Sequence, residues 1–135
     1  MVHRLDLRVR FCELDPYGHV NHSVYVQYFE VGRVEALADA GVGLDVLQRE
    51  LGLSLVVVEI RTRFMASAVL GDDLVVESGL SRIGRAKATW EQRILAGDRV
   101  IATQELASGC VTAAGKPTRF PAELVEALGP YRMDG

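Results

Sequence analysis

The chain has 135 residues, of which 49% are hydrophobic and 24% charged, and its formal net charge is -3 at pH 7. This length suits a single domain over residues 1–135 with its own core, and the composition is typical of a folded globular protein. The negative charge argues against a nucleic-acid-binding protein, which needs a surplus of Lys and Arg on one face.

The chain contains no segment that predicts insertion into a membrane. No stretch approaches the roughly 18 uninterrupted apolar residues that a membrane helix needs. The N-terminus, with His3, Arg4 and Asp6, lacks the apolar core of a signal peptide. We therefore expect a cytoplasmic protein with no membrane partner.

The first expected element is a strand over residues 5–11, in which apolar and polar residues alternate. Asp15, Pro16 and Gly18 then stand where a type I turn favours them, and the proline keeps the residue before it extended. The chain is therefore expected to turn directly after Asp15.

A long helix is expected over residues 21–40, where apolar side chains recur at helical spacing. Asn21 or Ser23 can cap its start, and Gly41 can end it. Gly32, in its middle, costs about 1 kcal/mol relative to alanine. We therefore expect another part of the backbone to approach the helix at Gly32.

The rest of the chain predicts a short helix, four strands and a last helix. The short helix covers residues 44–50, the strands cover 56–64, 74–80, 85–94 and 100–112, and the last helix covers 121–128. Strands joined by short turns pair antiparallel, and one long amphipathic helix is the natural cover for their apolar face. The expected fold class is α+β.

The two cysteines, Cys12 and Cys110, lie far apart and fall in or next to expected strands. They form neither a zinc-ligand pair nor a Cys-x-x-Cys motif. We predict two buried free thiols.

The segment of residues 13–25 holds the richest chemistry, because it runs from a strand end into a helix start. Four backbone N-H groups at the start of a helix lack internal partners, and the helix dipole adds positive charge there. A carbonyl group between these amides and Asp15 would meet a base or nucleophile on one side and donors on the other. On its own, the Asp15 tetrapeptide predicts only a turn. His19 and His22 are too few to predict a zinc site with Asp15, and a Cys12–His19 nucleophile pair is disfavoured.

Residues 8–37 resemble the start of the 4-hydroxybenzoyl-CoA thioesterase type of hotdog protein. The pattern is an acidic residue, Asp, Gly and Val at fixed spacing, then Tyr and a helix with aromatic residues, Glu and Arg. Later strands, with Arg63-Phe64 followed by Gly71-Asp72, extend the resemblance over nearly the whole chain. The matching positions are Glu13, Asp15, Gly18, Val20, Tyr25, Tyr28, Phe29, Glu30, Arg33 and Glu35.

The resemblance implies an antiparallel sheet wrapped around one long central helix, the hotdog fold. It makes Asp15 the nucleophile or general base and gives polarisation of the carbonyl to a backbone N-H near His22. His19 and Asn21 fill positions that vary among relatives and are further candidates. Family active sites form between two subunits, so residues 59–65 of a partner chain should complete each pocket. The resemblance thus implies an acyl-CoA thioesterase with no cofactor beyond the coenzyme A of its substrate.

Basic and aromatic residues are candidates for binding the substrate. Arg82, Arg85 and Lys87, near the turn at Gly84, could meet the phosphates of coenzyme A, although a charged strand face is more often simply solvated. Arg61 and Arg63 are second choices. Tyr25, nearest the helix start, could line an acyl pocket.

Three rivals remain open at this point. The same site could hydrolyse an acyl or polyketide chain from an acyl carrier protein. A hotdog hydratase or dehydratase would need a His deep in the long helix, which the sequence lacks. A non-catalytic acyl binder would tolerate loss of Asp15. In each case a sheet with one covering helix leaves an open edge, which predicts a homodimer or homotetramer.

Overall fold

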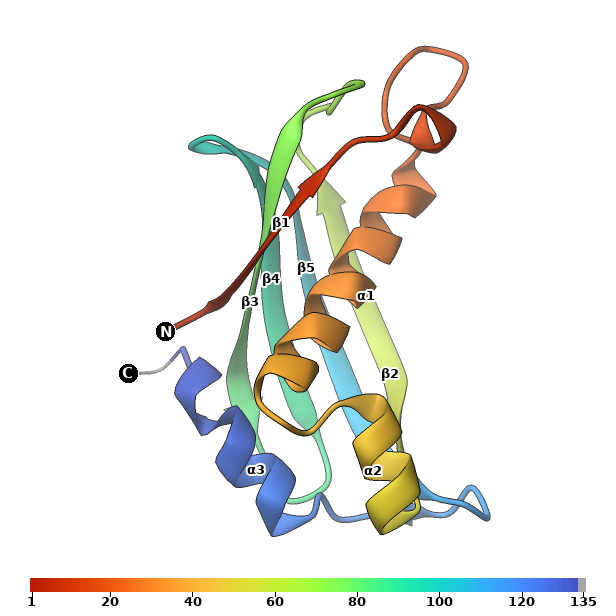
Figure 1. Cartoon of the computed structure of the whole chain (residues 1–135), viewed down its shortest axis with the longest axis vertical. Helices are drawn as coiled ribbons and strands as arrows, with labels where there is room; N and C mark the ends of the chain where they lie inside the picture. Colours follow the sequence, from red (N-terminus) through yellow and green to blue (C-terminus); the bar gives the residue numbers. More distant parts are fainter. Residues whose placement is uncertain (134–135) are drawn as a thin grey trace.

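The structure, a computed structural model, describes residues 1–133 and is built on one curved antiparallel sheet (Figure 1). Five strands follow the order β1-β3-β4-β5-β2, and the short β6 pairs with β5. All paired strands are antiparallel. The α+β class expected from the sequence is confirmed. The strands are β1 (His3–Arg8), β2 (Leu53–Phe64), β3 (Asp73–Ile83), β4 (Ala88–Ala96), β5 (Arg99–Thr112) and β6 (Pro117–Thr118).

The long helix α1 (His22–Asp39) lies across the inner face of the sheet (Figure 1). Its N-cap is Asn21, whose side chain accepts a hydrogen bond from the Ser23 N-H at 3.0 Å. The chain leaves the helix through Gly41, whose φ of 82° favours glycine. The shorter helices are α2 (Leu44–Leu51), α3 (Ala122–Leu128) and the 3-10 turns η1 (Phe11–Glu13) and η2 (Gly129–Tyr131).

Gly32 lies where α1 approaches the sheet most tightly. A Cβ atom at this position would lie 2.7 Å from Cγ1 of Val76, 3.0 Å from Oγ of Ser78 and 3.2 Å from Nε2 of Gln92. The helix is crowded at Gly32, but the expected approach of backbone is wrong, because the nearest groups are side chains of the sheet. Glycine is needed because these buried neighbours leave no room for a methyl group.

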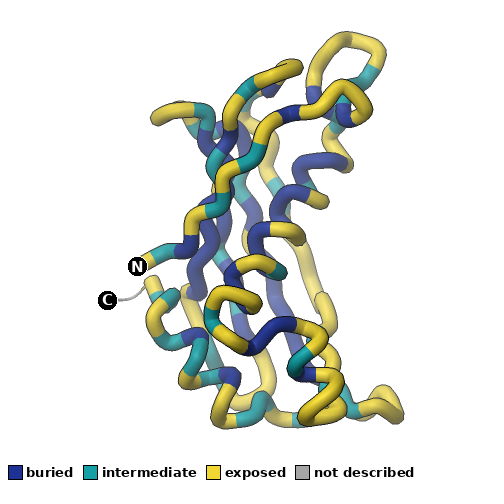
Figure 2. Tube along the Cα trace, viewed as in Figure 1, coloured by how far each residue is buried: buried dark blue, intermediate teal, exposed yellow. Residues whose placement is uncertain are grey.

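Two apolar clusters fill the space between α1 and the sheet. One surrounds Phe29 and Ile94 near the start of α1, and the other surrounds Leu47, Trp90 and Leu106 towards its end. Each fully buried large side chain contributes about 1.5–3 kcal/mol by leaving water. Figure 2 shows the burial concentrated on α1 and the central strands, while β2 stays exposed.

Strand β2 does not form a hairpin with β3, contrary to the expectation that the four strands after the short helix are joined by short turns and pair in sequence order. Residues 65–72 carry the chain from β2 at one edge to β3, which pairs with β1 and β4. β2 pairs with β5 instead. A strand's own pattern does not name its partner, because partner choice depends on contacts far apart in sequence.

The N-terminal strand is shorter than expected and Cys12 is not buried. β1 ends at Arg8, and the chain enters the 3-10 turn η1, leaving Phe11 78% exposed and Cys12 also exposed. The turn brings Glu13 inward, which directs its neighbours outward. Cys110 is buried as predicted, and its burial raises the pKa of its thiol.

Strand β2 forms an open apolar edge. Val57 and Val58 are 52% and 63% exposed, and Ile60 and Phe64 are 43% and 49% exposed. A register shift between Val57 and Glu59 makes Val58 an extra residue, which is a β-bulge. An exposed apolar edge strand is a template for pairing with another chain.

No helix within residues 1–133 is long and apolar enough to cross a membrane.

Candidate active site

The loop around Asp15 is held by its own side chain. The Asp15 N-H donates to the His19 carbonyl at 2.7 Å, and the Gly18 N-H donates to the Asp15 carbonyl at 3.1 Å. Oδ1 of Asp15 accepts from the N-H groups of Tyr17 at 2.9 Å and His19 at 3.2 Å. Within residues 1–133, no donor bonds to Oδ2. One oxygen of Asp15 is therefore fixed in the loop, and the other is available to a ligand.

A neighbouring loop braces the Asp15 loop. The Val20 N-H donates to the Ala68 carbonyl at 2.9 Å, and His19 forms a β-bridge with Val69. The Asn21 N-H donates to the Glu13 carbonyl at 2.9 Å. These bonds fix the entry of the chain into α1 relative to Asp15.

Glu13 anchors the same loop from inside the protein. Its carboxylate accepts from the Tyr28 hydroxyl at 2.7 Å, the Arg10 N-H at 2.8 Å and the Arg10 guanidinium at 3.1 Å. Burial alone would raise the pKa of Glu13, but these donors outweigh it and hold that pKa below its ordinary value. Burial, and then the bond to Glu13, raise the pKa of Tyr28. No pattern in the sequence predicts this pair, because an acidic residue in a loop usually stays in water.

The start of α1 offers one free amide. Asn21 uses its side chain on the Ser23 N-H and its carbonyl on the Val24 N-H. Within the described chain, no acceptor takes the His22 N-H, which is one of the amides that a helix start leaves unpaired. Asn21 is thus the helix cap, and the His22 amide is left without an acceptor in the described chain.

Aromatic side chains wall the helix start. The ring of Phe64, at the end of β2, lies 6.3 Å from the His22 ring and 5.8 Å from the Tyr25 ring, between centroids. Tyr25 is buried, and its hydroxyl accepts from the Ala68 N-H at 3.0 Å. Tyr25 therefore packs in the core beneath the site, while Phe64 and His22 remain exposed beside it.

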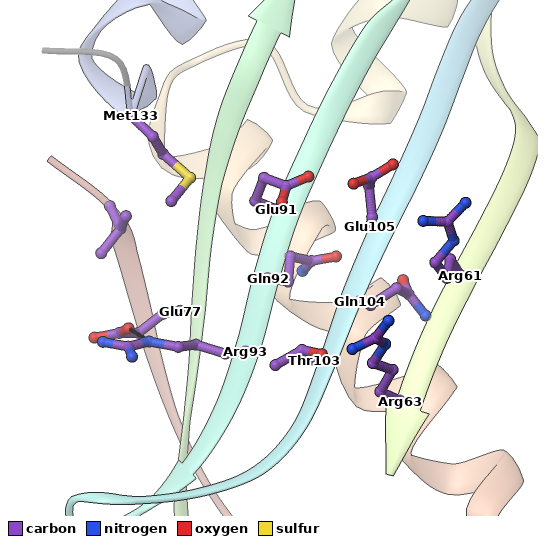
Figure 3. A pocket seen from close by; sticks show the side chains of 11 residues that line it. Arg61, Arg63, Glu77, Glu91, Gln92, Arg93, Thr103, Gln104, Glu105 and Met133 are labelled. Carbon is purple, nitrogen blue, oxygen red and sulfur yellow. Dashed lines mark hydrogen bonds and ion pairs between the residues drawn. The ribbon is translucent and has the colours of Figure 1, made fainter. Parts of the chain in front are cut away.

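Arg61 and Arg63 lie on the outer face of the sheet, opposite α1. They stand beside Glu105 and Thr103 in register, and this row lines a cavity of about 400 Å³ (Figure 3). Lys87 joins Arg61 in a second cavity of about 100 Å³ on the same face.

The other basic candidates also lie away from Asp15. Arg82 and Arg85 are exposed beside the β3–β4 turn, at the end of the sheet opposite the Asp15 loop (Figure 1). One chain therefore does not bring any of the five predicted basic residues to Asp15.

A buried polar network on the inner face escaped the sequence analysis. The Arg33 guanidinium, on α1, donates to the side-chain oxygens of Gln92 and Gln104, both at 2.9 Å. The sequence pattern could have indicated this network, because each glutamine lies two positions from a buried apolar residue of its own strand, Trp90 or Leu106, and so points to the same face. A polar residue in an inward row usually has a partner there.

No three His, Cys, Asp or Glu side chains of residues 1–133 are placed to hold a metal ion.

Comparison with known proteins decides the family. A model described as "Thioesterase-like superfamily" matches residues 9–128. The chain belongs to that superfamily. It is 30% identical to the acyl-CoA thioesterase YbgC of Haemophilus influenzae over 90% of both chains. These matches make it a member of a family of thioester hydrolases.

Solved structures agree with this membership. A probable thioesterase from Bartonella henselae superimposes with a TM-score of 0.86 at 30% identity, covering 90% of this chain and all of that one. A 1,4-dihydroxy-2-naphthoyl-CoA thioesterase from Synechocystis, at 17% identity, shares the fold with a TM-score of 0.87 over 96% of both chains. The expected hotdog fold is confirmed.

Plant relatives extend beyond the matched region. The chain is 34% identical over 92 residues to the chloroplastic acyl-acyl carrier protein thioesterase ATL3 of Arabidopsis thaliana. The match covers 68% of this chain but only 48% of ATL3, so the chain spans about half of that relative.

Proposed function

We propose that the protein hydrolyses acyl-CoA thioesters at a site between Asp15 and the start of α1. The observation that carries the proposal is the Asp15 carboxylate, in which loop amides hold one oxygen and the other oxygen is free. It stands beside the start of a helix, where the His22 N-H has no acceptor within residues 1–133. A thioester carbonyl bound there would meet a base or nucleophile and an oxyanion donor together.

Two routes fit this arrangement. In the first, Asp15 attacks the carbonyl carbon, the C–S bond breaks to release the coenzyme A thiolate, and water opens the resulting anhydride. In the second, Asp15 takes a proton from water, the water oxygen attacks the carbonyl, and the same C–S bond breaks. In both routes the His22 N-H stabilises the oxyanion. His19 holds the Asp15 loop through its backbone, while its exposed ring is free to contact substrate.

The site is proposed to be shared between two subunits. Two copies that pair antiparallel along β2 place the Leu53 end of one strand beside the Phe64 end of the other. The loop that leads into α1 lies at the Phe64 end of β2, and the turn between β3 and β4 lies at the Leu53 end (Figure 1). An inverted partner would therefore bring its basic turn and the Leu53 end of its β2 towards Asp15, although neither lies there within one chain.

An acyl carrier protein is the alternative carrier. The specific observation in its favour is the match to the Arabidopsis protein named as an acyl-acyl carrier protein thioesterase. Both carriers present the thioester on the same phosphopantetheine arm, so the Asp15 chemistry would be unchanged.

The direct test is a panel of acyl-CoAs assayed with a thiol reagent. We expect free coenzyme A from the wild type and a loss of kcat of a hundredfold or more, on the order of a base or nucleophile deletion, for Asp15→Asn. Asparagine keeps an oxygen for the N-H groups of Tyr17 and His19, so the loop should survive. Near-normal turnover by Asp15→Asn would rule out the proposed role.

A matched control separates chemistry from loop structure. Asp72 also holds a loop by accepting a backbone N-H, that of Val69 at 3.0 Å. Asp72→Asn should therefore retain kcat.

Other outcomes would identify a rival function. Water addition to an enoyl-CoA without thiol release would indicate a hydratase, and tight acyl-CoA binding without turnover would indicate a binder. Release of acyl groups only from acyl carrier protein would select that carrier.

A further inference from the structure

Arg33 is a buried cation that forms no ion pair within residues 1–133. It lies in the middle of α1, and only 9% of its surface is exposed. Within residues 1–133, no carboxylate lies within ion-pair distance of its guanidinium. Burial lowers the pKa of Arg33 to about 10, which still leaves it charged at neutral pH. The nearby Glu30 carboxylate offsets part of this shift, but the hydrogen bonds of Arg33 go only to neutral groups, which is a costly way to bury a charge and calls for a reason.

Neutral glutamines hold this cation in a fixed position. Gln92 donates through Nε2 to the Phe29 carbonyl and to Ser78 Oγ, both at 2.8 Å. Gln104 donates through Nε2 to Thr62 Oγ1 at 2.9 Å. Because their amide ends are occupied, both glutamines turn their oxygens to the same nitrogen of Arg33, Nη1. The guanidinium is thus oriented without being neutralised.

Arg33 also lines a groove. Nε and Nη2 of Arg33 donate to no acceptor within the described chain, and Arg33 lines a groove of about 110 Å³ between α1 and β2. Glu30 stands at the groove's rim, exposed and beyond ion-pair distance. The other walls are mainly apolar and include Leu37, Leu55, Val57, Trp90 and Leu106.

We propose that this groove binds a carboxylate at the far end of the acyl group, so that ω-carboxylated acyl thioesters are the preferred substrates. The inference rests on the proposed thioesterase function and deepens it. An acyl carboxylate would pair with Nε and Nη2 of the guanidinium in the bidentate manner that arginine favours. The apolar walls would hold the methylenes that precede it.

The groove lies where a shared site can use it. It is lined by Leu55 and Val57, near the Leu53 end of β2, whereas the loop that leads into α1 lies at the Phe64 end. Within one chain, Arg33 is about 17 Å along the helix from His22, at 1.5 Å per residue. Antiparallel pairing of two β2 edges turns the groove of one subunit towards the Asp15 loop of the other, which shortens that span.

The test compares acyl-CoAs of equal length that end in a carboxylate or a methyl group. Succinyl-, glutaryl-, adipyl- and suberyl-CoA are paired with butyryl-, pentanoyl-, hexanoyl- and octanoyl-CoA. We expect kcat/KM at the best length to favour the carboxylate about tenfold or more, as one charge-assisted pair supplies. Arg33→Met should abolish or reverse that ratio while methyl-ended substrates are still hydrolysed. Glu35→Gln, an exposed change on the same helix, should leave the ratio unchanged.

A binding measurement covers the case in which Arg33→Met does not fold. Calorimetry with Asp15→Asn, which keeps Arg33, should show tighter binding of adipyl- or suberyl-CoA than of hexanoyl- or octanoyl-CoA. A preference for the methyl end at every length, or an unchanged ratio in a folded Arg33→Met, overturns the inference. Asp15-dependent hydrolysis of methyl-ended substrates would then still support the proposed function. No hydrolysis of any substrate would refute that function, while the binding preference would still test the groove.

Discussion

Tyr28→Phe removes one atom from the anchor beneath the active-site loop. The lost hydroxyl donates to the Glu13 carboxylate, a buried charge that has two remaining donors, both from Arg10. Removing one donor to a buried charged group costs about 1.5–3 kcal/mol. At about 4 °C per kcal/mol for a domain of this size, Tm should fall by about 6–12 °C.

Tyr25→Phe is the matched control. Its hydroxyl accepts from the Ala68 N-H, so the bond that it loses is neutral and worth about 1 kcal/mol. Both changes delete one hydroxyl from a buried ring on the same helix. Urea unfolding followed by circular dichroism at one protein concentration should therefore show the larger loss for Tyr28→Phe.

The pH dependence gives a second measurement on the same pair. The Glu13 pKa is lowered in the folded protein, so its contribution is present above the unfolded value of about 4.3 and is lost as pH falls through the folded pKa. The stability gap between wild type and Tyr28→Phe should be full at pH 7 and shrink below about pH 4.3. The gap for Tyr25→Phe should not follow this trend. Equal losses for both variants at pH 7, with no change at low pH, would refute the assigned role of Glu13.

Three further predictions follow from the packing and the site. Gly32→Ala should lower the free energy of unfolding by about 1 kcal/mol, because crowding against Val76 costs about 1–3 kcal/mol and outweighs the gain in helix propensity of about 1 kcal/mol. Denaturant unfolding measures this change, and a stabilised variant would contradict the prediction. A single turnover in heavy-oxygen water should label the protein if Asp15 forms an anhydride opened at its own carboxyl carbon, and only the acid product if it activates water. Two inactive variants, Asp15→Asn and the double change Arg82→Glu with Arg85→Glu in the turn that an inverted partner would bring to Asp15, should regain up to about a quarter of full activity when dissociated and reassembled, because half the dimers carry one intact site. No recovery despite confirmed mixing would mean unshared sites, and an active arginine variant would remove those residues from the site.

Local signals in the sequence determined much of the architecture. The spacing of apolar residues, the Asn21 cap and the Gly41 stop specified α1, because helix periodicity and capping act over only a few residues. Alternation located the strands, and Gly32 predicted a close contact because only a crowded site justifies a glycine inside a helix. The motif around Asp15 indicated the family because its turn and helix entry form one continuous segment.

Tertiary structure alone decided where these elements meet. The sequence could not place β2 at the sheet edge, because strand partners are chosen by contacts remote in sequence. It could not show Cys12 exposed, because that follows from turning Glu13 inward to meet Tyr28. Nor could it show Arg33 buried against glutamines from two strands. Each of these outcomes depends on which side chains share a small buried volume, and short-range patterns do not encode that.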